Sequence, residues 1–281
     1  MPKILLTGSD GQLGKALQKE LSSDFEVSAF IRKELDIVNF KEVEKVCEKL
    51  KPDFIVNAAA FTAVDRAETE RELALKINSE AVRNLAQICK KNGTKLIHFS
   101  TDYVFDGEGE NGFVEDDEAR PVNFYGESKL AGEREILKSG CDFAIVRTSW
   151  LFGEGENFVT KMLELAGKNT QIKVVSDQIG SPTFTVDLAK MTHEILDKNL
   201  SGIFHATNSG ATSWADFARK IFEIKNFPTK VLEISTVEFP TPAKRPRNSV
   251  LRNTKLPKLR SWEEALGEFL KKEYNFNNFP K

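Results

Sequence analysis

The amino-acid sequence predicts an α/β fold, built on a doubly wound, mostly parallel sheet with a smaller lobe towards the C-terminus. Three observations indicate this. Short apolar runs alternate with helical patterns through the first half of the chain, and the connections between them are short. A glycine-rich turn joins the first apolar run to the first helical pattern. The 281 residues, of which 40% are hydrophobic and 29% charged, are enough to bury a full core.

Five short apolar runs predict the strands of the first half. The first of them, KILLT, is stopped by Gly8, which suits a buried parallel strand. The predicted strands are residues 3–7, 26–31, 53–60, 95–100 and 141–149, of which the third runs on into a loop.

Helical spacing of apolar residues fills the intervals between these runs. The first helical pattern repeats leucine and alanine at Leu13, Ala16, Leu17 and Leu21. The predicted helices are residues 12–21, 40–50, 71–91 and 128–138. Strands that alternate with helices in this way favour a Rossmann-type sheet with helices on both faces.

The pattern loosens after Trp150, where we place a soft boundary between a first domain (1–150) and a C-terminal lobe (151–281). The lobe is predicted to supply one more strand at 202–208, so it partly returns to the sheet. Its predicted helices are 156–167, 185–197 and 213–225. A proline-rich stretch at 239–249 holds three cations, and it is either a plain connector or an anion site.

Composition excludes several classes of protein. The net charge of −2 gives no general attraction to nucleic acid or to an anionic membrane. No apolar run approaches the length of a membrane span, and glycine appears too early for a signal peptide. The three scattered cysteines fit a reducing compartment. We therefore expect a soluble, cytoplasmic protein.

The glycine-rich turn TGSDGQLG predicts a dinucleotide site in the first domain. Its spacing is GxxGxxG, and it lies between a strand and a helix, where backbone N–H groups and the helix dipole can hold a pyrophosphate. A turn without a ligand is the alternative. The predicted cofactor residues here are Gly8, Asp10, Gly11, Gln12, Leu13 and Gly14.

The end of the second strand bears on the choice of cofactor. An NAD site usually has an acid about 20 residues past the glycines, but this chain has Arg32 and Lys33. Either cation could hold a 2′-phosphate, which favours NADPH over NADH, or both could be solvated surface charges. The remaining predicted cofactor residues are Asp36, Ile37, Ala58, Ala59 and Ala60.

Tyr125 and Lys129 are a candidate catalytic pair. They are four residues apart and share a face if the segment is helical. An ammonium beside a phenol lowers the pKa of the phenol, which eases proton transfer. STDYVF places hydroxyl side chains at the end of the fourth strand, where open α/β sheets bind their ligands. The glycine turn, the strand-end hydroxyl and the Tyr–Lys pair together are much more specific than any one of them, and they favour a catalytic role for Tyr125 over a structural one.

At this point the chain resembles the extended short-chain dehydrogenase/reductase family, and within it the branch that reduces dTDP-linked 4-keto sugars. The resemblance covers about nine tenths of the chain. It is carried by TGSDGQLG, VNAAAFTAVDRAE, IHFSTDYVFDG, YGESKLAGE, VRTSWLFG, SDQIGSPTF, GIFHATNSGATSWADFA and RPRNSVL.

The resemblance implies that Thr101, Tyr125 and Lys129 are catalytic, with Tyr125 as proton donor, and that Tyr125 and Lys129 also contact the NAD(P)H. It implies substrate contacts from Val64, Thr101, Asp102, Tyr103, Trp150 and Arg245, the last on the diphosphate. Trp150 could instead be core packing. Gln178, Pro182, Thr183 and Asn248 lie in motifs of the substrate lobe.

Some members of this family bind Mg²⁺ through glutamates at a dimer interface, one of them early on the first helix. Here that place reads Gly14-Lys15-Ala16, so we predict no metal site and either a monomer or a homodimer. His98, His193 and His205 are far apart in sequence and are expected to be structural. The rival functions are a non-catalytic regulatory subunit of methionine adenosyltransferase, and a reductase, epimerase or dehydratase of another nucleotide sugar.

Overall fold

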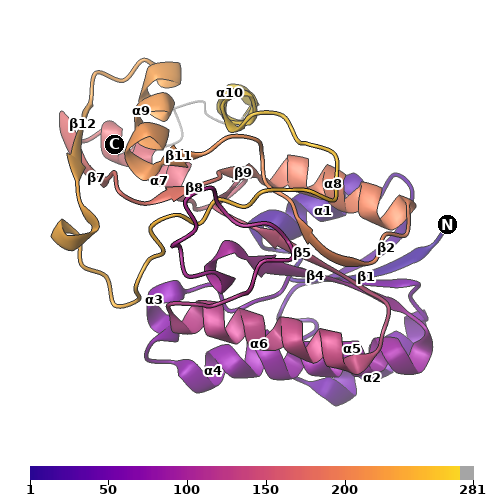
Figure 1. Ribbon diagram of the computed structural model, residues 1–281. Coiled ribbons are helices and arrows are strands. Elements are labelled where there is room, and N and C mark those ends of the chain that lie inside the picture. The colour runs from indigo at the N-terminus through magenta and orange to yellow at the C-terminus, as the bar shows by residue number, and fades with distance from the viewer. Residues whose placement is uncertain (273–281) are drawn as a thin grey trace.

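The centre of the protein is a six-stranded sheet whose strands are all parallel. A computed structural model describes residues 1–272, and within it the strand order is β10-β5-β4-β3-β1-β2. The strand β2 is added on one side of β1, and β3, β4, β5 and β10 follow on the other side, so the strand order changes direction between β1 and β3 (Figure 1). The strands are β1 (Lys3–Thr7), β2 (Glu26–Phe30), β3 (Phe54–Asn57), β4 (Lys95–Thr101), β5 (Phe143–Thr148) and β10 (Gly202–His205).

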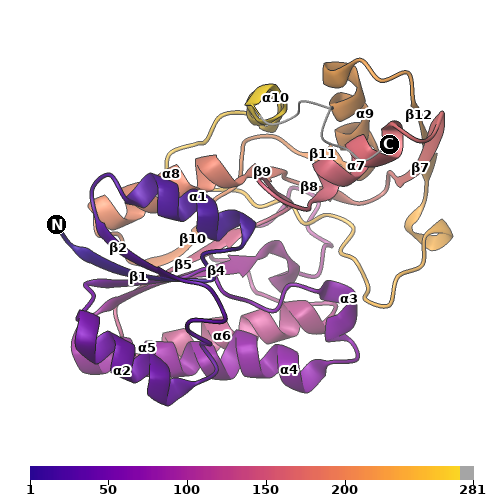
Figure 2. The same cartoon turned by 180° about the vertical axis from the view of Figure 1, so that it is seen from behind.

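Helices cover both faces of this sheet, as the alternating pattern predicts. On one face α1 (Gln12–Leu21) packs beside α8 (Thr185–Asp197), and on the other lie α2 (Phe40–Leu50), α5 (Ala81–Asn92) and α6 (Phe124–Ser139) (Figures 1 and 2). Successive residues of a strand point to opposite faces. Accordingly Ile4 and Leu6 join the α1/α8 core, and Leu5 joins the α2/α5 core.

The predicted helix at 71–91 is continuous but not uniform. It consists of α4 (Arg71–Leu75), a π-helical turn η1 (Lys76–Glu80) and then α5. The π-helical turn carries the buried Asn78, whose amide side chain bonds the backbone N–H and C=O of Phe61 and the hydroxyl of Ser128. The wider turn therefore fastens the loop after β3 to α6. Periodicity alone could not reveal this change of helix type.

The C-terminal lobe is a set of short elements around an aromatic core that includes Phe152, Phe184, Phe217 and Trp262. Two of its helices, α7 and α9, were predicted from helical spacing, whereas its short strands, its 3-10 turn and the helix α10 were not. The lobe comprises β6 (Leu151–Phe152), α7 (Phe158–Ala166), β7 (Gln171–Val175), β8 (Ile179–Gly180), β9 (Thr183–Phe184), β11 (Thr212–Ser213), α9 (Trp214–Lys225), β12 (Lys230–Ile234), the short 3-10 turn η3 (Thr236–Glu238) and α10 (Trp262–Lys272).

Two elements from the second half of the chain belong to the sheet domain formed by the first half. β10 pairs with β5 at the edge of the sheet, and α8 covers α1, although both follow residue 150. No helix within residues 1–272 is long and apolar enough to cross a membrane.

A buried ion pair connects β5 to α6. Arg147 donates from Nε and Nη2 to the two carboxylate oxygens of Glu133, at 3.0 and 2.7 Å. Both side chains are at most 4% exposed. Glu115, in the long connection after β4, accepts hydrogen bonds from Thr254 at the other end of the chain. These contacts anchor the connection that leads from β4 to α6.

Candidate active site

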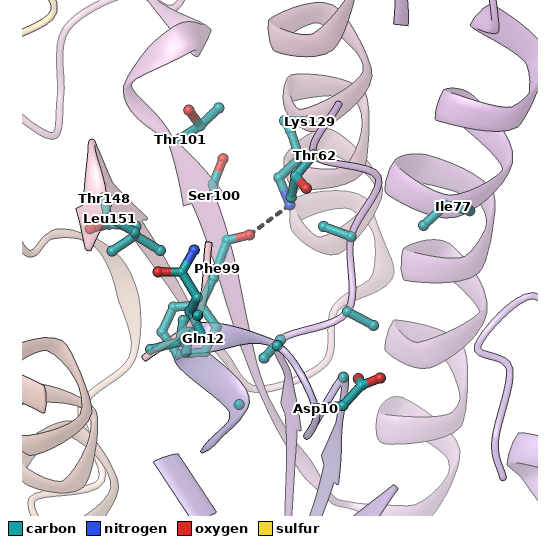
Figure 3. A pocket seen from close by; sticks show the side chains of 18 of the residues that line it. Asp10, Gln12, Thr62, Ile77, Phe99, Ser100, Thr101, Lys129, Thr148 and Leu151 are labelled. Carbon is teal, nitrogen blue, oxygen red and sulfur yellow. Dashed lines mark hydrogen bonds between the residues drawn. The ribbon is translucent and has the colours of Figure 1, made fainter. Parts of the chain in front are cut away.

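A pocket of about 920 Å³ opens where the strand order changes direction, beside the carboxyl ends of β1, β3, β4 and β5. This is the position at which open α/β sheets bind ligands. The predicted site residues that line it are Gly8, Asp10, Gly11, Gln12, Leu13, Gly14, Arg32, Asp36, Ile37, Ala58, Ala59, Ala60, Val64, Thr101, Asp102, Tyr125, Lys129 and Trp150. Figure 3 shows side chains from the glycine turn, β4, β5 and α6 around one space.

The glycine turn is shaped by close backbone approach. Gly8 has φ +68°, and a Cβ there would lie 2.7 Å from the backbone nitrogen of Ala59. A Cβ on Gly14 would lie 2.1 Å from the carbonyl oxygen of Gly8. The helix α1 then begins with Gly11 as its N-cap, without a side-chain cap and without an acid in its first turn. Such a helix start suits an anionic group.

Two buried hydroxyls at the strand ends also suit a ligand. Ser100 Oγ and Thr148 Oγ1 have no hydrogen-bond partner within residues 1–272, and both residues line the pocket. Buried polar atoms are nearly always paired in folded proteins. The residues present therefore fit a dinucleotide whose polar groups would form hydrogen bonds with these two hydroxyls.

The far end of the pocket carries the residues expected near the adenosine. Arg32 is exposed and forms a 3.6 Å ion pair with Asp36, one helical turn's spacing along the chain. Ile37 is buried and lines the same pocket. A partner phosphate for Arg32 would compete with the Asp36 carboxylate.

A loop that sequence reasoning missed closes over the glycine turn. Glu154, Gly155 and Glu156 line the pocket, and Gln12 donates its amide N–H to the carbonyl of Glu156 at 2.9 Å. Lys15, which occupies the place of the family's metal-binding acid, forms a 2.7 Å ion pair with Glu154. This loop has no motif that would have marked it in the sequence. Residues 1–272 contain no cluster of three His, Cys, Asp or Glu side chains able to hold a metal.

Thr101 and Asp102 lie at the end of β4. Thr101 Oγ1 donates to Asp102 Oδ1 at 2.9 Å and accepts from the Tyr103 N–H at 3.2 Å. Asp102 is 3% exposed, and its second oxygen has no partner in the described part of the chain. Burial raises the pKa of Asp102 to about 7, because its hydrogen bonds only partly offset the loss of solvent.

Tyr125 is the second residue of α6, whose N-cap residue Asn123 accepts from the Gly126 N–H at 2.9 Å. The ring of Tyr125 meets that of Tyr103 edge to face at 5.9 Å. Burial, and then the Asp102 carboxylate, raise the pKa of Tyr125 above its usual value. The prediction that Lys129 lowers this pKa is therefore wrong for this arrangement.

The reason is the direction in which Lys129 points. Its Nζ donates to the carbonyl of Phe99 at 2.7 Å (Figure 3) and lies 3.3 Å from His98 Nε2. Burial lowers the pKa of Lys129 to about 8. The expectation that His98 is only structural is thus incomplete, since His98 contacts a predicted catalytic residue.

Trp150 forms part of the pocket wall. It adopts φ +45° and stacks on Trp214, with ring centroids 3.4 Å apart and planes 6° apart. Both indoles line the pocket, and Gly180 packs against the Trp150 ring. Trp150 is therefore both packed and pocket-facing. Trp214 was missed because it reads as the first residue of an amphipathic helix.

Two predicted substrate residues, Tyr103 and Arg245, do not line the pocket. Arg245 donates to Asp65 Oδ2 at 2.9 Å and to the carbonyl of Ala243 at 3.0 Å. Binding a diphosphate would have to replace the ion pair with Asp65. The lobe residues Gln178, Thr183 and Asn248 bond other loop residues, and neither they nor Pro182 line the pocket.

The chain is similar to known proteins over nearly its whole length. Residues 2–275 match the family described as the RmlD substrate binding domain. The chain is 40% identical to the spore coat polysaccharide biosynthesis protein SpsK of Bacillus subtilis, over 96% of this chain and 97% of that protein. It is 41% identical to the dTDP-4-dehydrorhamnose reductase of Aggregatibacter actinomycetemcomitans, over 95% and 97%. The dTDP-4-dehydrorhamnose reductase of Bacillus anthracis, solved in complex with NADP, superposes with a TM-score of 0.95 at 40% identity, over 97% of this chain and all of that one.

Proposed function

Because this chain belongs to the RmlD substrate binding domain family, we propose that it reduces dTDP-4-dehydro-L-rhamnose to dTDP-L-rhamnose with NADPH. One observation supports this most. A single pocket runs from a dinucleotide-type glycine turn to the hydroxyls of Thr101 and Tyr125. A nicotinamide and a sugar ketone could therefore meet there.

The cofactor would be held by the glycine turn at its pyrophosphate, by Arg32 or Asp36 at the adenosine and by Ala58–Ala60 along its length. When bound, it supplies the hydride that the ketone accepts at C4. The exposed Arg32 favours NADPH, and the solved relative in complex with NADP supports the same preference. NADH remains the second cofactor to test.

Tyr125 would donate the proton to the developing alkoxide. A donor must carry its proton at working pH, and burial, which raises the pKa of Tyr125, favours the protonated phenol. Thr101, the last residue of β4, would orient the carbonyl oxygen by a hydrogen bond. Lys129 would hold the nicotinamide ribose and so place the hydride donor.

The sugar would lie between Val64, Asp102 and the Trp150 indole, all of which face the pocket. The free oxygen of Asp102 could accept a hydroxyl of the sugar. Tyr103 would act through its ring contact with Tyr125. We also propose a cytoplasmic location, which the three free buried cysteines support.

The test is a reaction of the purified protein with NADPH and enzymatically generated dTDP-4-keto-L-sugar, without added metal. We expect substrate-dependent loss of the nicotinamide absorbance and dTDP-rhamnose as the product. The matched variant Tyr125→Phe should bind NADPH with unchanged affinity while turnover falls by about 10²–10⁴-fold. Unchanged turnover would remove Tyr125 from the mechanism.

If the wild-type protein binds cofactor but shows no turnover, even with added Mg²⁺ or with NADH, the proposal is refuted. The regulatory role or another nucleotide sugar would then be the better account. Chromatography of the same sample decides between a monomer and a homodimer.

A further inference from the structure

The amide side chain of Asn157 joins the C-terminal lobe to the glycine turn. Asn157 is the N-cap of α7, whose buried residues belong to the aromatic core of the lobe. Its Nδ2 lies 2.7 Å from the carbonyl oxygen of Gly153, 3.0 Å from that of Gly155 and 3.3 Å from Gln12 Oε1. Gln12 is the first residue of α1, and its own Nε2 donates to the carbonyl of Glu156 at 2.9 Å. The two amides therefore hold the loop that leads into α7 against the start of α1.

The orientation of both amides follows from partners that can act in only one way. The backbone N–H groups of Val159 and Thr160 donate to Asn157 Oδ1 at 2.9 and 3.2 Å, so the oxygen belongs on the side of the helix. The NH₂ group then faces two backbone carbonyls, which can only accept. In the same way the Glu156 carbonyl fixes the Gln12 amide, whose oxygen is left to accept from Asn157.

These contacts account for the choice of asparagine at this N-cap. Serine, threonine and aspartate cap helices about as well, because each supplies the acceptor oxygen. None of them also carries an NH₂ group, so none could cap α7 and donate to the loop at the same time. The helix alone does not require asparagine at position 157, whereas the loop does.

The loop held in this way, residues 153–156, lies at the expected cofactor site. Its last three residues line the pocket together with the glycine turn. A Cβ on Gly155 would lie 3.6 Å from Gln12 Cγ, so the loop backbone packs on the aliphatic part of that side chain. Lys15 Nζ forms a 2.7 Å ion pair with Glu154, which places a cation beside one of the two carboxylates of the loop. The loop can therefore lie next to a site for an anion.

We propose that Asn157 is a positioning residue for the dinucleotide cofactor, because it holds the loop and the Gln12 side chain in place over the glycine turn. A loop that is ordered in advance removes an entropy cost from ligand binding. Without the Asn157 NH₂ group the loop has to be ordered when the cofactor binds, so the affinity falls. The inference rests on the proposed function only in taking NADPH as the ligand of the glycine turn.

The test is NADPH binding to the purified protein, without sugar, measured by calorimetry. Asn157→Ser keeps an oxygen that caps α7 but lacks the NH₂ group. We expect its Kd for NADPH to rise about tenfold, the effect of losing one or two hydrogen bonds of ordinary strength. In the reductase assay the KM for NADPH should rise by the same factor, while kcat at saturating NADPH stays within about twofold because the reacting groups are unchanged.

Thr160→Val is the matched control, because it alters the other half of the same cap. Thr160 Oγ1 bonds the backbone N–H and the backbone carbonyl of Asn157, each at 2.9 Å. Its loss weakens the cap and leaves the Asn157 amide in place. We expect Tm to fall by roughly 2–4 °C and the Kd for NADPH to stay within about twofold. An equal rise in Kd for Thr160→Val would assign the effect to the helix cap and overturn the proposal.

A second variant asks whether Asn157 acts through Gln12. Gln12→Leu keeps an aliphatic contact with Gly155 but lacks the amide, so its Kd should rise by a similar factor. The double variant should bind NADPH no more weakly than the weaker single variant, since both changes release the same loop. Additive losses, or an unchanged Kd in a folded Asn157→Ser, overturn the proposal. If Asn157→Ser does not fold, an unchanged Kd in Gln12→Leu overturns it.

Failure of this inference is distinct from failure of the proposed reaction. A wild-type protein that binds NADPH but reduces no sugar contradicts only the reaction, because binding is measured without sugar. An active wild-type protein whose Asn157→Ser variant binds NADPH equally well contradicts only the role of Asn157.

Discussion

Gly14→Ala tests whether the glycine turn is shaped by backbone contact. The added Cβ would lie 2.1 Å from the Gly8 carbonyl oxygen and 2.7 Å from Ser9 Cα, so the start of α1 would have to move. Overpacking costs up to about 3 kcal/mol, while alanine gains about 1 kcal/mol over glycine inside a helix. The expected net loss is about 2 kcal/mol of unfolding free energy, which lowers Tm by roughly 4–8 °C.

Gly11→Ala is the matched comparison within the same turn. Gly11 has φ −72°, and its Cβ would lie 3.4 Å from the Gly8 carbonyl, an ordinary contact. We expect its stability to stay within about 0.5 kcal/mol of wild type. Urea titrations and thermal melts of the three proteins measure the difference. If Gly14→Ala melts with the wild type, or Gly11→Ala falls as far as Gly14→Ala, the steric argument fails.

Three further outcomes are expected. Burial raises the folded-state pKa of Asp102 to about 7, so the free energy of unfolding of the wild type decreases as the pH rises through that value. In Asp102→Asn this group no longer titrates, so the free energy of unfolding measured in urea should decrease less than that of the wild type between about pH 4 and pH 8. Parallel pH profiles for the two proteins would contradict it. Glu133→Gln leaves the buried Arg147 guanidinium without its counter-charge and should cost about 3–5 kcal/mol by urea unfolding, and a cost below about 1 kcal/mol would show that the pair is dispensable. Arg32→Ala should lower kcat/KM for NADPH but not for NADH, and an equal effect on both cofactors would make Arg32 a solvated charge.

The sheet and the pocket edge could be predicted because local patterns determine them. Each strand of the sheet is a short apolar run with a turn after it, and the glycine turn and the Tyr125–Lys129 spacing are readable without any tertiary contact. The predicted start of α6 at 128 was late by four residues, because the Asn123 cap was not recognised. Caps of this kind are visible in a sequence but weakly specific.

The remaining features depend on contacts between distant residues. Strand β12 exists because it pairs with β7, about 60 residues earlier, and α10 is held by the lobe's aromatic core. The side of His98 that faces Lys129, and the loop of Glu154 over the glycine turn, follow from packing alone. The sequence predicted a lowered pKa for Tyr125, whereas burial raises it. Sequence spacing could not show that the Lys129 side chain points to the Phe99 carbonyl.

The order in which the chain is synthesised has a consequence for the sheet. Leu13, Leu17 and Leu21 of α1 are covered by α8, whose residues emerge from the ribosome more than 160 positions later. Until then a nascent chain carries an apolar helix face and the unpaired outer edge of β5, both of which invite aggregation. Truncations before β10 and α8 should therefore accumulate with chaperones, and a sheet domain cut at residue 150 is not a useful expression unit.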